Sequence, residues 1–139
     1  MQFETSIHIN APAAAIFALY EDVAGWPTWD TDVKSASIQG AFVSGARGVI
    51  APNGGPKSDI VFSDVIRDKS FTANCKLPLC AMRFEHELHA RDGGTEATHR
   101  VVFSGLLAPV FGRLIGSGMR KTLPQVMIGL KAAAEKSQA

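Results

Sequence analysis

The side chains most able to do acid–base, nucleophilic or metal chemistry are few in this sequence. They are four histidines and two cysteines: His8, His86, His89, His99, Cys75 and Cys80. His86 and His89 lie three residues apart in a segment with strand periodicity, where such an offset places side chains on opposite faces. They therefore cannot bind one metal ion together. We predict no metal site and no cofactor, and we expect the two cysteines to be reduced thiols.

His86 and His99 are the polar residues that deserve most interest, because both fall on apolar faces of predicted strands. One face of the strand Met82–Ala90 carries Met82, Phe84, His86, Leu88 and Ala90, and one face of the strand Glu96–Leu106 carries Ala97, His99, Val101, Phe103 and Gly105. If the turn is Arg91–Gly94, these faces align and Arg100 lies opposite or diagonal to Glu85 and Glu87. In this register the two histidines are neighbours on an otherwise apolar inner surface.

Burial on that surface would lower the pKa of both imidazoles and keep them neutral near pH 7. Three roles stay open for His86 and His99. They are core histidines that bond to the backbone, to water or to each other, or they orient a polar group of a bound ligand, or they act as an acid–base pair. No serine or cysteine can be matched with a base from the sequence, and the inner face has no carboxylate pair.

A long C-terminal helix must cover the surface that holds these histidines. From Ala108 to Lys136 apolar residues recur at steps of three and four: Phe111, Leu114, Ile115, Met119, Leu123, Val126, Met127, Leu130 and Ala133. Such a helix spans about 40 Å. Pro124 is expected to kink or break it near Arg120–Leu123. Its glycines either let the backbone pack closely on the sheet or separate a mobile first part, acting as a lid, from a rigid second part.

The rest of the chain predicts an antiparallel sheet. Phe3–Ile9 alternates like a strand, Pro12 starts a helix that runs to about Asp22, and Pro27 starts a short helical turn within Trp26–Asp30. Six further strands follow: Lys34–Phe42, Arg47–Ala51, Asp59–Arg67, Phe71–Leu77, Met82–Ala90 and Glu96–Leu106. We therefore predict one α+β domain over residues 1–139, in which seven antiparallel strands curve around the C-terminal helix and two short helices follow the first strand.

Composition excludes several classes of function. The 139 residues are 46% hydrophobic, and 14 Lys and Arg scattered along the chain balance 13 Asp and Glu to a net charge of +1. A nucleic-acid binder would show a basic face, so we predict no nucleic-acid partner. The most apolar stretch, Val101–Met119, is interrupted by Pro109, Arg113 and glycines, which argues against a membrane span. The first ten residues do not resemble a signal peptide, and we expect a cytoplasmic protein without integral membrane association.

The order of elements resembles the helix-grip fold of the START and Bet v 1-like (SRPBCC) superfamily, and most closely the polyketide cyclase/dehydrase and lipid-transport-like family. The resemblance covers almost the whole chain, and its motifs are Ile9-Asn10-Ala11-Pro12 with Ile16-Phe17, Trp26-Pro27-Thr28-Trp29, Phe84-Glu85-His86-Glu87-Leu88, the strand Thr95–Gly105 ending in Phe103-Ser104-Gly105, and Leu123-Pro124 with Leu130-Lys131. It implies a ligand cavity between sheet and helix, but the fold also hosts cyclases, receptors and co-chaperones.

We therefore predict a site for a small hydrophobic or amphipathic molecule, such as a lipid, a polyketide or an aromatic compound. The predicted lining is Phe62, Phe71, Cys75, Met82, Phe84, His86, Leu88, His99, Val101, Phe103, Leu114 and Met119. The alternatives are a polyketide cyclase/dehydrase-type enzyme that uses His86 and His99, and a co-chaperone-like interaction module; a homodimer is compatible with all three. Arg47 is expected to face solvent. The loop Asn53–Pro56 is predicted to be a hairpin loop at the cavity entrance rather than a phosphate loop, because Pro56 precedes Lys57.

Overall fold

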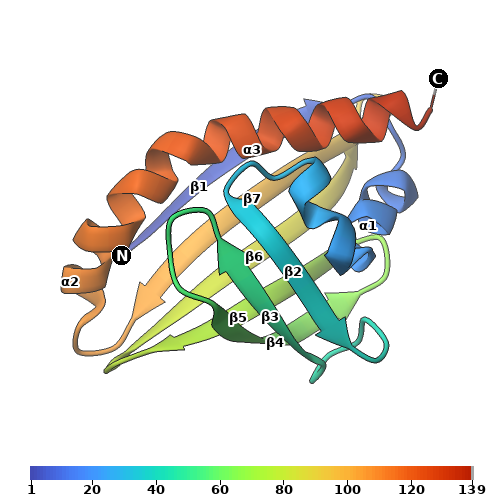
Figure 1. Ribbon diagram of the computed structural model, residues 1–139. Helices are drawn as coiled ribbons and strands as arrows, with labels where there is room; N and C mark the ends of the chain where they lie inside the picture. Colours follow the sequence, from blue (N-terminus) through green and yellow to red (C-terminus); the bar gives the residue numbers. More distant parts are fainter. Residues whose placement is uncertain (139) are drawn as a thin grey trace.

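The seven predicted strands form one antiparallel sheet in the computed structural model, which describes residues 1–138 (Figure 1). The strands are β1 (Gln2–Ile9), β2 (Val33–Gln39), β3 (Arg47–Pro52), β4 (Ser58–Ile66), β5 (Ser70–Leu77), β6 (Cys80–Arg91) and β7 (Gly94–Ser104). They lie in the order β1-β7-β6-β5-β4-β3-β2, so β1 and β2 are the two edges. The sheet curves strongly around the helices, as Figure 1 shows.

The predicted β6–β7 register is confirmed. Arg91 pairs with Gly94, and His86 pairs directly with His99. The two connecting residues, Asp92 and Gly93, have φ values of 49° and 77°. A two-residue hairpin loop with both φ values positive matches the right-handed twist of the strands, which explains the Asp-Gly sequence.

Charged residues on the convex face add to this register. The Arg100 guanidinium donates to carboxylate oxygens of Glu4, Glu85 and Glu87, at 3.0, 2.9 and 2.7 Å. These hydrogen bonds raise the pKa of Arg100 above its usual value, and the bond from Arg100 lowers the pKa of Glu87. Because β1, β6 and β7 each supply a carboxylate or the guanidinium, the cluster ties three neighbouring strands together.

Helices cover the concave face. They are α1 (Ala13–Glu21), the 3₁₀ helix η1 (Val23–Thr28), and a C-terminal helix made of α2 (Ala108–Phe111), a π-helical turn η2 (Gly112–Gly116) and α3 (Ser117–Lys136). The predicted bounds of the long helix, Ala108–Lys136, are confirmed. The expected break at Pro124 is not seen, because α3 continues through that residue. The irregularity lies instead in η2.

One residue of the predicted apolar stripe was placed wrongly. Leu114 was assigned to the stripe, yet it is 73% exposed, while Gly112 and Gly116 are buried. Leu114 lies nine residues before the buried Leu123, and at about 100° per residue this offset turns it to the opposite side of the helix. Beyond η2 the stripe is as predicted, with Leu123, Val126, Met127 and Leu130 buried on the sheet side. Two hydrogen bonds connect the C-terminal part of α3 to the end of β1 and the residue that follows it. Lys131 Nζ donates to the His8 carbonyl at 3.1 Å, and the Glu135 carboxylate accepts from the Asn10 amide at 2.8 Å.

Glycines let the C-terminal helix approach its neighbours closely. A Cβ on Gly129 would collide with the carbonyl oxygen of Trp29, and a Cβ on Gly116 would lie 3.2 Å from the ring of Phe103. Of the two interpretations offered by the sequence, these contacts favour close backbone packing. Gly118 differs, because nothing lies within 4 Å of its Cβ position.

Replacement of Gly129 by Ala is predicted to destabilise the protein, because the collision is with backbone and only a shift of α3 can relieve it. The expected loss is about 1–3 kcal/mol in the free energy of unfolding. The matched control, Gly118→Ala in the same helix, should be neutral or stabilising by up to about 1 kcal/mol. Urea denaturation measures both; equal effects of the two substitutions would contradict the packing described for Gly129.

Candidate functional site

Two histidines lie side by side on the concave face of the sheet. The imidazole rings of His86 and His99, paired across β6 and β7, have centroids 4.4 Å apart and an interplanar angle of 70°. On its other side His86 stacks on the ring of Phe71, with centroids 3.8 Å apart and planes 9° apart. Each side chain is therefore held by packing as well as by hydrogen bonds.

The hydrogen bonds around His86 and His99 indicate which nitrogens carry protons. His86 Nδ1 lies 3.2 Å from the carbonyl oxygen of Phe71, and a carbonyl only accepts, so Nδ1 carries the hydrogen. In the neutral ring His86 Nε2 is then an acceptor. His99 Nε2 lies 2.8 Å from the hydroxyl oxygen of Tyr20, which reaches it from α1 and is completely buried. We call Tyr20, His86 and His99 the polar triad.

The polar triad is uncharged near neutral pH. Burial lowers the pKa of His86 to about 3, although its bonds to backbone oppose the shift. Burial also holds the pKa of His99 well below its usual range, and a charge on His86 would lower it further. For Tyr20, burial raises the pKa far above that of free tyrosine. The triad can therefore exchange hydrogen bonds with a ligand but offers it no charge.

Aromatic rings fill the interior around the triad. Tyr20 contacts Phe71 with ring centroids 4.9 Å apart and Trp29 at 6.0 Å, and Trp26 contacts Phe62 at 6.0 Å. Trp29 is 5% exposed, and its indole Nε1 is a buried donor without a hydrogen-bond partner among the described residues. Such a donor costs about 1–3 kcal/mol when left unpaired, so an acceptor beside it would be bound favourably.

Most of the predicted lining residues share this interior. Eight are buried: Phe62, Phe71, Cys75, Met82, Leu88, His99, Val101 and Phe103. Phe84, His86 and Met119 are partly exposed, and Leu114 lies on the outer surface, for the reason given above. Phe84 and His86 belong to the concave face between the buried residues Met82 and Leu88. The helices therefore leave this part of the concave face within reach of solvent.

Two residues of the site, Tyr20 and Trp29, were not among the predicted lining residues. Tyr20 is the single tyrosine of the chain, and it lies on the same helix face as Ile16 and Phe17. That signal was available, because a buried tyrosine hydroxyl needs a partner and few polar groups were predicted inside. No local pattern could show that this partner is His99, 79 residues further along the chain.

A carboxylate also lies near the site. Burial raises the pKa of Asp30, which directly follows Trp29, to about 6. Its Oδ1 accepts from the Asp32 amide at 2.9 Å, and Asp32 in turn accepts from the Thr122 hydroxyl at 2.6 Å. This chain of bonds connects the start of β2 to α3. Within residues 1–138 no group of three or more His, Cys, Asp or Glu side chains is placed to hold a metal ion.

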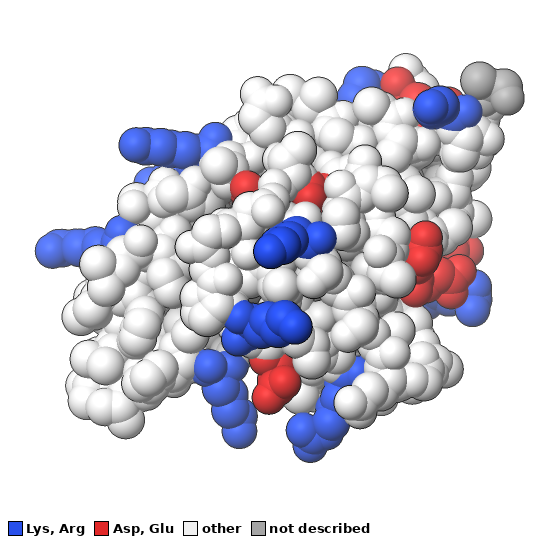
Figure 2. All heavy atoms as spheres, viewed as in Figure 1, with Lys and Arg blue, Asp and Glu red and all other residues white. Residues whose placement is uncertain are grey.

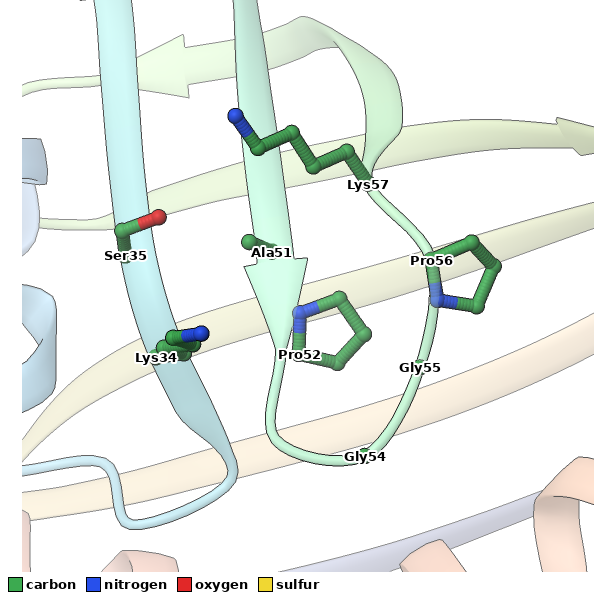
Figure 3. A pocket seen from close by; sticks show the side chains of 8 residues that line it. All are labelled: Lys34, Ser35, Ala51, Pro52, Gly54, Gly55, Pro56 and Lys57. Carbon is green, nitrogen blue, oxygen red and sulfur yellow. The ribbon is translucent and has the colours of Figure 1, made fainter.

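An open hollow of about 770 Å³ lies on the other face of the sheet, between β2, β3 and the loop Asn53–Pro56 (Figure 3). Its wall includes Ser35 and Ala51, whose neighbours Ala36 and Ile50 pack against the core from the opposite face. The loop thus borders an outer hollow, and Asn53 is anchored there by a 2.6 Å bond from its amide nitrogen to the Thr31 carbonyl. Arg47 is exposed, as expected.

A seven-stranded antiparallel sheet curved around a long C-terminal helix, with two short helices after β1, is a START-like fold. The chain belongs to the polyketide cyclase/dehydrase and lipid transport family, whose model matches residues 1–135. No protein with curated annotation matches the sequence.

Several solved structures share the fold. A START superfamily protein from Mycobacterium smegmatis is 13% identical with a TM-score of 0.77, over 97% of both chains. Protein MLL2253 from Mesorhizobium loti is 18% identical with a TM-score of 0.78, over 98% of both chains. The Aha1 dimer from Colwellia psychrerythraea is 16% identical with a TM-score of 0.74, over 97% of this chain and 96% of that chain.

The two concave-face histidines, His99 buried and His86 partly buried, predict a pH dependence of stability. Their pKa values in the folded protein lie below the usual 6.5, so below that pH the unfolded chain binds more protons than the folded one. Stability is then complete above about pH 6.5 and falls on acidification, by up to about 1.4 kcal/mol per pH unit for each histidine. Urea denaturation at pH 7.5, 6.5 and 5.5 should show a smaller loss in the double variant His86→Gln/His99→Gln than in wild type.

Comparison with a variant is needed because Asp30 acts in the opposite direction. Its pKa is raised in the folded protein, so its contribution to stability falls as pH rises from about 4 to about 6. Asp30 is present in both proteins and cancels in the difference between them. His89→Gln, on the exposed side of β6, is the matched control and should keep the wild-type dependence. A double variant with an unchanged pH dependence would contradict the neutral state of the pair.

Proposed function

We propose that the protein binds a small hydrophobic or amphipathic molecule between the concave face of the sheet and the C-terminal helix. The observation that carries this proposal is the neutral polar triad, set in an apolar face that stays partly exposed at Phe84 and His86. Apolar walls with a few well-placed polar groups are the usual composition of a small-molecule site. The family description, which includes lipid transport, and the START-like fold support the same function.

The proposed contacts are the predicted lining without its outward-facing member, Leu114. They are Phe62, Phe71, Cys75, Met82, Phe84, Leu88, Val101, Phe103 and Met119 around His86 and His99. Burial raises the pKa of Cys75 to about 11, which keeps it a protonated thiol and suits it to an apolar wall rather than to nucleophilic chemistry. Met119 and Phe84, at the partly exposed part of the site, are the side chains that a ligand would displace first, and methionine adapts its shape readily.

The polar groups favour a neutral ligand with a hydroxyl or similar group. His86 Nε2 can accept a hydrogen bond from such a group, and Trp29 Nε1 can donate one. The triad has no charge to pair with a carboxylate or an amine, and transferring either ion into this interior without a partner is costly. The ligand we propose is therefore largely apolar with one hydroxyl-like end.

An enzymatic role for the histidines has less support. A general base works best when its pKa lies near the working pH, whereas burial holds the pKa of His86 at about 3. A homodimer and an intracellular location belong to the proposal as well. The dimeric Aha1 structure of the same fold supports the first, and the free cysteines Cys75 and Cys80 support the second.

The role of the polar triad is tested with two small aromatic ligands of similar size, 1-naphthol and 1-methylnaphthalene, each displacing the fluorescent probe N-phenyl-1-naphthylamine. Wild type should bind 1-naphthol more tightly by roughly 3- to 12-fold, since one buried hydrogen bond contributes about 0.5–1.5 kcal/mol. The double variant His86→Gln/His99→Gln should lose most of this preference. Ile128→Ala, on the exposed face of α3, should keep it.

Native mass spectrometry of the protein from its own host, followed by solvent extraction, reports whether a ligand is bound in cells. A stoichiometric extra mass that leaves on denaturation is the expected result. If wild type shows neither an extra mass nor saturable probe binding, the proposal of a ligand site is wrong. Probe binding that the histidine variant leaves unchanged would instead refute the role given to the triad.

A further inference from the structure

One end of the molecule carries a cluster of exposed apolar side chains. Leu79, Leu106, Val110 and Leu114 are 66%, 79%, 47% and 73% exposed. They come from the β5–β6 turn, the connection between β7 and α2, and the start of the C-terminal helix. Figure 1 shows α2 and the β5–β6 turn at the same end of the molecule. The Leu107 amide donates to the Leu79 carbonyl at 3.0 Å, which holds the two connections together. We call these four residues the apolar tip.

The backbone of Leu79 indicates that its side chain is not there by chance. Pro78 and Leu79 form a two-residue loop between the paired residues Leu77 and Cys80, and Leu79 has a φ of 51°. Glycine or asparagine is favoured at such a position, and a bulky residue with positive φ is uncommon. Leu79 thus combines a strained backbone with an exposed apolar side chain, and folding benefits from neither. Strain of this kind points to a use for the side chain.

The two stretches of chain that build the apolar tip carry charges of one sign. No Asp or Glu occurs between Ala97 and Ala134 or between Lys69 and Phe84, the two stretches that build this end of the molecule. The same stretches place exposed Lys76, Arg113, Arg120 and Lys121 on or near it. In Figure 2 the corresponding end is white, with blue side chains extending beside it and no red. A shallow hollow of about 360 Å³ there is lined by Pro109, Val110, Arg113 and Leu114.

We propose that the apolar tip docks on the surface of an anionic lipid bilayer. The leucines and Val110 would enter the boundary between headgroups and acyl chains, while Arg113 and the neighbouring cations lie at the level of the phosphates. Apolar side chains bordered by basic ones are suited to this boundary, where burial and charge attraction add. None of the described helices has both the length and the apolar character needed to cross a bilayer, so the contact is peripheral.

A second copy of the chain fits the apolar tip less well. In a two-fold dimer through the tip, both surfaces would carry the same basic side chains, so like charges would be brought together with no acidic residue of these stretches to separate them. An anionic surface complements the same cations. The proposal does not depend on the ligand site, because its residues are on the outer surface and its test uses no bound ligand.

Sedimentation with lipid vesicles tests the docking surface. Wild type should bind phosphatidylcholine vesicles that contain about 30% phosphatidylglycerol, more weakly at about 0.5 M than at about 0.1 M NaCl, since salt screens the attraction. Leu106→Glu/Leu114→Glu should reduce binding at least about tenfold, and Arg113→Gln should reduce it by about fivefold. The matched control is Ile66→Glu/Ile128→Glu, which changes residues that are 54% and 51% exposed elsewhere on the surface and should keep wild-type binding.

The controls make each outcome decisive. All variants are first compared with wild type by circular dichroism and thermal unfolding, so that a misfolded variant is not counted. No binding to anionic vesicles, or equal loss in the tip variant and its control, would overturn the proposal. Equal binding to pure phosphatidylcholine would overturn the anionic surface. A concentration-dependent dimer that the tip variant abolishes, without vesicle binding in wild type, would overturn it in favour of self-association.

Discussion

The structure depends on the need to cover the concave face of a strongly curved sheet. Seven twisted strands present more apolar surface than one helix can bury, so α1, η1 and their aromatic side chains must fill what α3 leaves open. Tyr20, Trp26 and Trp29 come from this short segment and occupy the centre of the interior. Because residue 129 is a glycine, α3 packs directly against the backbone carbonyl of Trp29. The site is therefore built by the same residues that complete the core.

The two faces of the sheet carry different kinds of polar group: charged side chains on the convex face and uncharged ones on the concave face. The carboxylates that bind Arg100 lie on the convex face, where water solvates them, while the concave face holds uncharged imidazoles and a hydroxyl. Neighbouring residues of one strand, such as Glu85 and His86, thus lie in opposite environments because strand side chains alternate. A hydrogen bond inside a largely apolar interior discriminates strongly between a partner that completes it and one that does not. The interior can select by shape and by one polar group, without attracting free ions.

Sequence periodicity predicted most of this fold, because alternation and turn chemistry are local. The pairing of His86 with His99 followed from the Asp92-Gly93 turn and the two apolar faces, and the bounds of the C-terminal helix followed from its apolar stripe. Leu114 was misplaced because steps of three and four residues drift away from one helix face when they are followed over several turns. Tyr20 and Trp29 were missed because the hydrogen bond of Tyr20 is made across 79 residues and the isolation of the Trp29 donor is a property of the packed interior. Tertiary packing decides such contacts, and no window of sequence contains them.

The π turn at Gly112–Gly116 makes the C-terminal helix tolerant of a change in length. Because a π turn holds one more residue than an α turn, deleting one residue there returns the turn to α geometry, and the segments on either side keep nearly the same orientation. Val110 before the turn and Leu123 and Leu130 after it would then face as they do now. A deletion in the regular part of α3 differs, because each residue of an α-helix turns the chain by about 100° and its loss would rotate one part of the helix against the other. The π turn is therefore the place in this helix where a one-residue difference in length is absorbed without re-aiming either end.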